Sequence, residues 1–140
     1  MFDFATNALL APTQTTPPRC AIYVRSATAD YERAIGQESA CDAWLSARVD
    51  ADIAASACKY VDLGHSGLGL DRPSLLRLLA DIEAGLFDVV IVCAFDRISR
   101  SSEVREFVLE LLEHSQTALI SVHEGLIFAP PLDVLEADDA

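Results

Sequence analysis

Basic residues are few in this 140-residue sequence: ten Lys and Arg stand against 22 Asp and Glu, giving a formal net charge of −12. A protein this acidic repels nucleic acid at long range, which argues against a free-standing DNA-binding protein. Lys59 is the single lysine, and the other nine basic residues are arginines. Arginine presents a fork of donors that suits an oxyanion, although a GC-rich genome also favours it.

Long apolar runs are missing as well. No segment reaches the roughly 18 apolar residues that a membrane-spanning helix needs. The opening MFDFATNALLAPTQTTPP has no basic stretch ahead of a long apolar one, so it does not read as a signal peptide. We therefore expect a cytoplasmic protein that makes no contact with a membrane.

Patterns that bind metals are absent too. Cys20, Cys41, Cys58 and Cys93 are scattered, and no two of them form a C-x-x-C pair. Buried, reduced thiols explain such spacing better than a zinc site or a disulfide framework. His65, His114 and His123 form no metal motif either, and a solvated loop histidine is the simpler interpretation of His65. We expect no metal and no cofactor.

The length and the local composition predict one small domain with loose ends. Residues 1–18 contain Pro12, Pro17 and Pro18 and no sustained period, so we interpret them as a flexible extension. Residues 19–128 would form the folded domain. Residues 129–140 form an acidic stretch interrupted by Pro130 and Pro131, which we expect to be a flexible tail.

Between these ends, short apolar runs alternate with segments of helical period. We expect strands near 20–24, 57–61, 87–95 and 117–122, the last of them being the final strand. We expect a first helix from about Ile35 to Arg48. A second would begin at an Asp71 N-cap, with Pro73 in its first turn, and end at Gly85, and a third would begin at a Ser101 or Ser102 cap. The buried helix faces would carry Leu75, Leu76, Leu78, Leu79 and Ile82, and Val104, Phe107, Val108, Leu111 and Leu112. This alternation predicts an α/β three-layer sandwich around a mostly parallel sheet of four to five strands.

Four arginines follow strands in this arrangement. Arg25 follows the first strand, Arg72 opens the helix after a Gly-rich loop, and Arg97 and Arg100 follow the central strand. Connections after parallel strands meet at one edge of the sheet, where such folds bind ligands. Each arginine could simply pair with an acid, as Arg97 with Asp96 or Arg72 with Asp71. A cluster of four at that edge favours a phosphate or phosphodiester site.

At these residues the sequence resembles the serine recombinases of the resolvase/invertase family, in their N-terminal catalytic domain. That family has a strand ending in Tyr-x-Arg-hydrophobic-Ser, then a Gln, an Asp-x-Gly-x-Ser-Gly loop, Asp-Arg-Pro, and a strand running into Asp-Arg-Leu-Ser-Arg. The matching residues, in order, are Tyr23 and Arg25; Gln37; Asp62, Gly64, Ser66 and Gly67; Asp71, Arg72 and Pro73; and Asp96, Arg97, Ile98, Ser99 and Arg100.

The resemblance implies DNA cleavage and strand exchange. In the family a serine hydroxyl attacks the scissile phosphate and becomes linked to the 5′ end, without a metal, because arginines neutralise the charge of the transition state. It also implies a resolvase-like fold and DNA as a partner, bound weakly by this chain alone. Carried over by position, the site residues would be Arg25, Arg72, Arg97 and Arg100, with Asp96 orienting the cluster and Gln37 in support.

The family's nucleophile is not at its usual position. The serine lies two residues after the arginine in the family, and that residue here is Ala27, a pattern that an engineered Ser-to-Ala change would also leave. Ser26 is one residue early, and neighbours in an extended segment point to opposite sides. Ser26 is therefore either a displaced nucleophile or an ordinary loop residue, and the retained arginines and Asp96 favour the first. Thr28 is a poorer substitute.

Two further features of the family are not found in these 140 residues. The long dimerising helix expected after the last strand gives way to prolines and acids, and no helix-turn-helix segment follows. The leading hypothesis remains a recombinase catalytic domain that cleaves DNA. The alternative is an inactive recombinase-like protein that acts through protein contacts, as a homo-oligomer or with another recombinase subunit. A flavodoxin-like ligand domain fits the sheet but leaves the arginine motifs unexplained.

Overall fold

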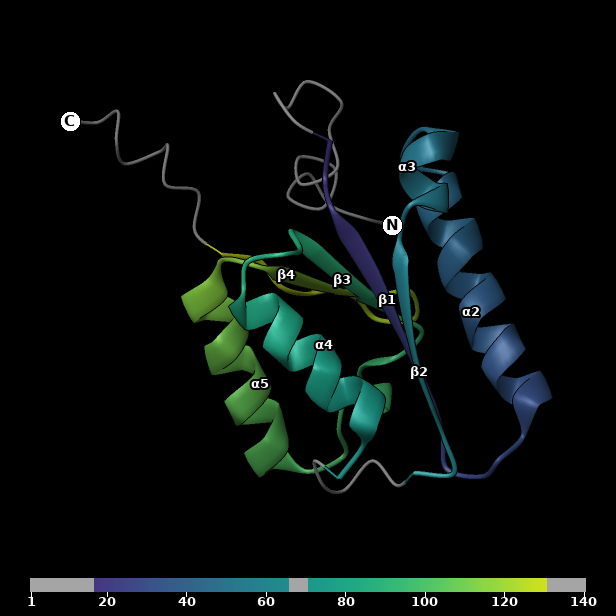
Figure 1. Cartoon of the computed structure of the whole chain (residues 1–140), viewed down its shortest axis with the longest axis vertical. Coiled ribbons are helices and arrows are strands. Elements are labelled where there is room, and N and C mark those ends of the chain that lie inside the picture. The colour runs from purple at the N-terminus through teal and green to yellow at the C-terminus, as the bar shows by residue number, and fades with distance from the viewer. Residues whose placement is uncertain (1–16, 66–70, 131–140) are drawn as a thin grey trace.

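The computed structural model describes residues 17–65 and 71–130 and shows an α/β sandwich (Figure 1). In the described residues, no helix combines the length and the apolar character needed to cross a membrane. The elements, in chain order, are β1 (Cys20–Ser26), α2 (Tyr31–Ser46), α3 (Ala51–Ala55), β2 (Cys58–Leu63), α4 (Pro73–Glu83), β3 (Val89–Val92), the 3₁₀ turn η1 (Phe95–Arg97), α5 (Ser102–Ser115), β4 (Ala118–Ser121) and β5 (Gly125–Phe128).

The sheet has five strands in the order β2-β1-β3-β4-β5. The first four run parallel, and β5 pairs antiparallel with β4. Parallel strands covered on both faces are apolar throughout, as in the fully buried VVIV of β3. The predicted fold class is therefore confirmed, with five strands. The strand after residue 122 was not expected, because GLIF is short and follows β4 after a turn of only three residues.

Alternation along β1 divides the core into two layers. Ala21 and Tyr23 contribute to the apolar cluster beneath α4 and α5, whereas Ile22 and Val24 contribute to the cluster beneath α2. Figure 1 shows these helices on opposite faces of the sheet. Side chains of neighbouring residues at the carboxyl end of β1 therefore begin from opposite sides of the sheet.

The helices differ from expectation at their ends and on their faces. Helix α2 begins at Tyr31, because Asp30 accepts from the backbone N–H groups of Glu32 and Arg33, and it ends at Ser46. The short α3 was not predicted. Ser101 caps α5, as expected. Two residues expected inward, Leu76 and Phe107, are about half exposed, since Leu75, Leu78, Leu79 and Ile82 already fill the inner stripe of α4, and Val108 and Leu112 that of α5.

The start of α4 corrects one prediction directly. Its N-cap position is Arg72, whose side chain makes no capping bond, and Asp71 is exposed. The capping carboxylate comes from Asp62 at the end of β2. Pro73 occupies the first turn as predicted, and Gly85, with φ of +80°, follows the end of the helix.

The four cysteines are free thiols, but they are not uniformly buried. Cys20 and Cys41 are buried, Cys93 is partly buried and Cys58 is exposed. The expectation of a buried thiol is therefore wrong for Cys58, because β2 is an edge strand whose first two residues are exposed. The predicted extension up to residue 16 and the predicted tail from residue 131 lie outside the described residues, so both stay predictions.

Candidate functional site

Three strand-to-helix connections meet at the carboxyl edge of the parallel strands. Arg25 lies near the end of β1, Arg72 lies at the start of α4, and Arg97 lies in η1 after β3. The structure brings these three arginines into one network of hydrogen bonds. Its centre is the backbone of residues 96–98, which accepts bonds from two of the guanidinium groups.

The guanidinium of Arg25 is directed at three backbone carbonyls. Nε donates to the carbonyl of Arg97 at 3.0 Å, Nη2 to that of Asp96 at 2.9 Å, and Nη1 to that of His65 at 3.1 Å. The residue is 1% exposed. Because neutral carbonyls satisfy donors without cancelling charge, this arrangement fixes the guanidinium and leaves its positive charge in the site.

Arg72 reaches the same turn from the other side. Its Nη1 donates to the carbonyl of Arg97 at 2.9 Å, and its Nη2 makes a short bond to the carbonyl of Ile98. Like Arg25, it is 1% exposed. Two buried guanidinium groups thus share the carbonyl of Arg97, which ties the ends of β1 and β3 to the start of α4.

Arg97 is the surface member of the set. Its Nη1 donates to the carbonyl of Arg25 at 3.2 Å, and its Nε pairs with the Asp96 carboxylate at 3.1 Å. The ion pair that the sequence offered as the simpler explanation of Arg97 is thus present. Arg100 is exposed, so it is not enclosed with the buried Arg25 and Arg72.

The concentration of positive charge affects Arg25 most clearly. Burial lowers the pKa of its guanidinium, and the neighbouring charges of Arg97 and Arg72 lower it further. An oxyanion near the cluster would relieve that repulsion through its charge, whereas the donors of Arg25 itself are already bonded to carbonyls. Chemically, the site can hold an anion and stabilise negative charge that develops on it.

Gln37 supports Arg25 through the backbone rather than through the guanidinium. Its Oε1 accepts from the N–H of Arg25 at 3.2 Å, and its Nε2 donates to the carbonyl of Arg25 at 2.8 Å. Strand β3 pairs with β1 only as far as Tyr23, so the amide of Gln37 satisfies two backbone groups just beyond that pairing. The predicted supporting residue therefore lies beside the site, on α2.

Asp62 and Tyr23 also help to position the arginines, a role that the sequence did not indicate. Asp62 is buried and accepts from the N–H groups of Ser74 and Leu75, both at 2.9 Å, and from the hydroxyl of Tyr23 at 2.8 Å. Tyr23 lies 3.4 Å from Nη1 of Arg72. Burial raises the pKa of Tyr23, and the bond to Asp62 raises it further, so the hydroxyl stays protonated and can donate. Asp62 therefore fixes the start of the helix that carries Arg72.

The hydroxyl nearest to Arg25 in sequence is enclosed. Ser26 is 2% exposed, and its Oγ lies 3.4 Å from Oγ1 of Thr28. By strand alternation its side chain starts on the α2 side with Val24, opposite to the side taken by Arg25. Ala27 and Thr28 are exposed. The predicted loop serine, Ser66, and Gly67 lie outside the described residues.

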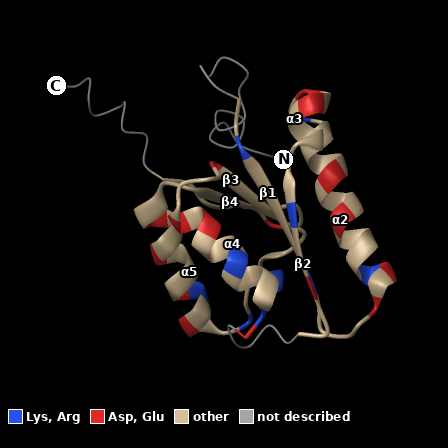
Figure 2. Ribbon diagram, viewed as in Figure 1, with Lys and Arg blue, Asp and Glu red and all other residues tan. Residues whose placement is uncertain are grey.

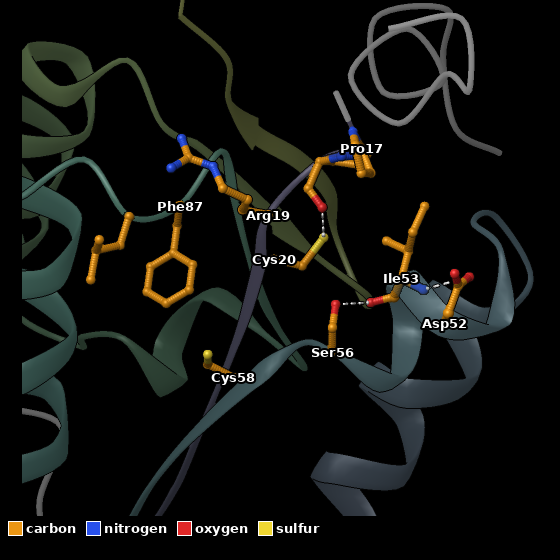
Figure 3. Close-up of a pocket in the computed structure, with 10 residues that line it drawn as sticks. Pro17, Arg19, Cys20, Asp52, Ile53, Ser56, Cys58 and Phe87 are labelled. Carbon is orange, nitrogen blue, oxygen red and sulfur yellow. Dashed lines mark hydrogen bonds between the residues drawn. The ribbon is translucent and has the colours of Figure 1, made fainter. Parts of the chain in front are cut away.

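A cavity in the described part of the chain lies away from the arginine network. This cavity, of about 370 Å³, lies at the amino ends of β1 and β2, lined by Arg19, Cys20, Ile53, Cys58 and Phe87 among others (Figure 3). The arginine network lies at the carboxyl ends of the same strands. The only arginine among the described residues that line this cavity, Arg19, already bonds to Asp88 and to the carbonyl of Gly85. We therefore assign the functional site to the cluster of arginines and not to this cavity. Among the described residues, no three His, Cys, Asp or Glu side chains form a metal-binding group.

Comparison with known proteins gives a consistent result. A family model, "Resolvase, N terminal domain", matches residues 20–135. The N-terminal catalytic domain of TP901-1 integrase is similar in structure, with a TM-score of 0.66 and 30% identity over 76% of this chain and 79% of that one. A resolvase family site-specific recombinase from Streptococcus pneumoniae has the same fold, with a TM-score of 0.62 and 21% identity over 77% of this chain and 74% of that one.

A sequence relative is much longer than this chain. The protein named "Putative DNA recombinase" in Bacillus subtilis (strain 168) is 41% identical over 80 residues. That match spans 57% of this chain and only 15% of the relative. The likeness therefore concerns only a small part of a longer protein.

Proposed function

Since the chain belongs to the family defined by the resolvase N-terminal domain, we propose that it takes part in DNA recombination as a recombinase-type domain that does not itself cleave DNA. One observation carries this proposal: the exposed Ala27 stands where the family's serine is expected, and the adjacent residue Ser26 is only 2% exposed. A methyl group cannot attack phosphorus, and an enclosed hydroxyl cannot reach it.

The arginine network is proposed to keep its affinity for a DNA phosphodiester. Arg25 and Arg72 fix the turn that contains Asp96 and Arg97, and Arg97 and Arg100 supply donors nearer the surface. This binding is weak for the chain alone, because a net charge of −12 opposes the approach of DNA. Figure 2 shows acidic residues along α2, α3 and α5.

Contact with recombinase subunits is the proposed route by which such a domain acts. Two helices on one face of the sheet each expose a large apolar side chain, Leu76 on α4 and Phe107 on α5. Exposed apolar groups are suited to protein contacts, and the acidic surface disfavours contact with DNA. The partner is either a second copy of this chain or an active recombinase-type subunit.

The second candidate function is an active recombinase that uses Ser26 as a displaced nucleophile. The observation that favours it is the hydrogen-bonded set of Arg25, Arg72 and Arg97 with Asp96, because clustered arginines can stabilise the charge that develops in phosphoryl transfer. For Ser26 to serve, the segment after β1 must turn the hydroxyl away from Thr28 and toward the arginines.

Covalent trapping distinguishes the two candidates. The wild-type chain, Ser26→Ala and Ala27→Ser are incubated with supercoiled plasmid DNA at low salt, and protein–DNA adducts are located by denaturing electrophoresis and peptide mass. We expect an adduct for Ala27→Ser alone, at the introduced hydroxyl. A wild-type adduct that disappears in Ser26→Ala would establish the active recombinase instead. Absence of an adduct in all three variants would count against the proposed phosphodiester site.

A further inference from the structure

The turn between β4 and β5 touches the arginine-bearing segment through one carboxylate. Oε1 of Glu124 accepts from the backbone N–H of Phe95 at 2.8 Å and from Oγ of Ser121 at 2.7 Å. Phe95 is the first residue of η1, and the first N–H groups of a helical turn have no partner within the turn. Glu124 thus acts as a cap supplied by a distant part of the chain.

The capping residue Glu124 is exposed, and it is also bonded to the buried Ser121 at its own end. The backbone N–H of Glu124 donates to Oγ of Ser121 at 3.1 Å, and Ser121 is fully buried. The first two residues of the turn after β4 are bonded to the last residue of β3 and the residue that follows it: the N–H of Val122 donates to the carbonyl of Val92 at 2.9 Å, and that of His123 to the carbonyl of Cys93 at 3.0 Å. The turn therefore has a fixed position over the strand that leads into η1.

The capped turn provides the acceptors that orient the arginines. Its carbonyls at Asp96 and Arg97 receive three bonds from Arg25 and Arg72. A rotation of the turn at Phe95 would move these carbonyls, and the guanidinium groups would have to follow or lose their bonds. Glu124 thus bonds to Phe95 at the start of η1, and the carbonyl of Arg97 at the end of η1 bonds to the two buried arginines.

We propose that Glu124 is a positioning residue for the arginine site. It acts through the backbone of η1 and makes no contact with a bound anion. The inference rests on the proposed function only in taking the arginine network as the phosphodiester site. It adds that the β4–β5 turn controls the alignment of this site, so that a change in the turn alters the guanidinium geometry on the other side of η1.

Nitrogen-15 NMR of the full chain tests this role without requiring activity. The readout is the Nε–H signal of Arg25, which reports its bond to the carbonyl of Arg97, and its rate of exchange with solvent. In Glu124→Ala we expect a shifted signal and about tenfold faster exchange, since one hydrogen bond is worth about 1.4 kcal/mol. Glu124→Gln keeps an oxygen acceptor for both donors, so it should restore the wild-type signal. Glu110→Ala, on the exposed face of α5, is the matched control.

An unchanged Arg25 signal in Glu124→Ala would overturn the proposal. So would an equal change in Glu110→Ala, or a Glu124→Gln variant that behaves like Glu124→Ala. A titration of the wild type with inorganic sulfate, followed on the Nε–H signal of Arg97, tests the phosphodiester site separately. If sulfate has no effect, that site fails, whereas the comparison of variants still decides the role of Glu124.

Discussion

Arg25 and Arg97 exchange hydrogen bonds reciprocally: Nε of Arg25 donates to the carbonyl of Arg97 at 3.0 Å, and Nη1 of Arg97 donates to the carbonyl of Arg25 at 3.2 Å. Two like charges are thereby held side by side through each other's backbone. The arrangement accounts for the order of the site and for the lowered pKa of Arg25, to which burial contributes most and the charges of Arg97 and Arg72 add. It also makes these arginines part of the architecture, so their loss should affect stability as well as binding.

Replacement of Arg72 should therefore be costly. Arg72→Ala removes a buried cation that donates to the carbonyls of Arg97 and Ile98, leaving them without these donors. We expect the free energy of unfolding in urea to fall by about 3 kcal/mol. Arg100→Ala, at an exposed position, should change it by less than about 0.5 kcal/mol. Equal effects of the two variants would contradict the structural role of Arg72.

The cap of α4 gives a second prediction. Asp62→Asn leaves one acceptor oxygen where the carboxylate now accepts three bonds, and its new NH₂ group opposes a backbone N–H. We expect a loss of about 1–3 kcal/mol in the free energy of unfolding. Asp71→Asn is the matched control, because Asp71 is exposed and does not cap the helix. A larger loss in Asp71→Asn would restore the assignment made from sequence.

Gln37 should protect the backbone of Arg25. Gln37→Ala removes an acceptor for its N–H and a donor to its carbonyl. We expect the Arg25 amide to exchange with solvent about tenfold faster, as the loss of one bond worth about 1.4 kcal/mol predicts. Gln37→Glu keeps the acceptor but sets its second oxygen against the carbonyl of Arg25, so its exchange rate should lie between those of the wild type and Gln37→Ala. If both variants exchange like the wild type, Gln37 does not hold Arg25.

The thiols should react in order of exposure. Burial raises the pKa of Cys20 to about 11, with a smaller contribution from Asp88, and burial raises the pKa of Cys41 to about 12. Near neutral pH both therefore stay protonated and unreactive, whereas Cys58 is exposed. Alkylation by iodoacetamide, followed by peptide mass, should label Cys58 first. All four should react once the chain is unfolded in urea, and early labelling of Cys41 in the folded protein would contradict its burial.

Sequence reasoning located the arginines but not their partners. Arg25, Arg72 and Arg97 could be placed at one edge because parallel strands end there. That they bind carbonyls 96–98 depends on the path of η1, which no periodic pattern reports. Asp62 was placed in the Gly-rich loop, and Asp71 was taken as the cap because it directly precedes the helix. A sequence pattern detects a capping residue next to its helix, but it does not detect one that a neighbouring strand supplies. Glu124 gave no signal at all, because its role requires the unpredicted β4–β5 hairpin.

The most direct measurement is the position of the Ser26 hydroxyl in a crystal structure grown in sulfate, with the anion marking the phosphate site. The account predicts that Oγ of Ser26 stays beside Thr28 on the α2 side, and that the methyl group of Ala27 lies closer to the sulfate. A Ser26 hydroxyl within about 3–4 Å of the anion, directed into the cluster of Arg25, Arg72 and Arg97, would contradict it and identify Ser26 as the nucleophile.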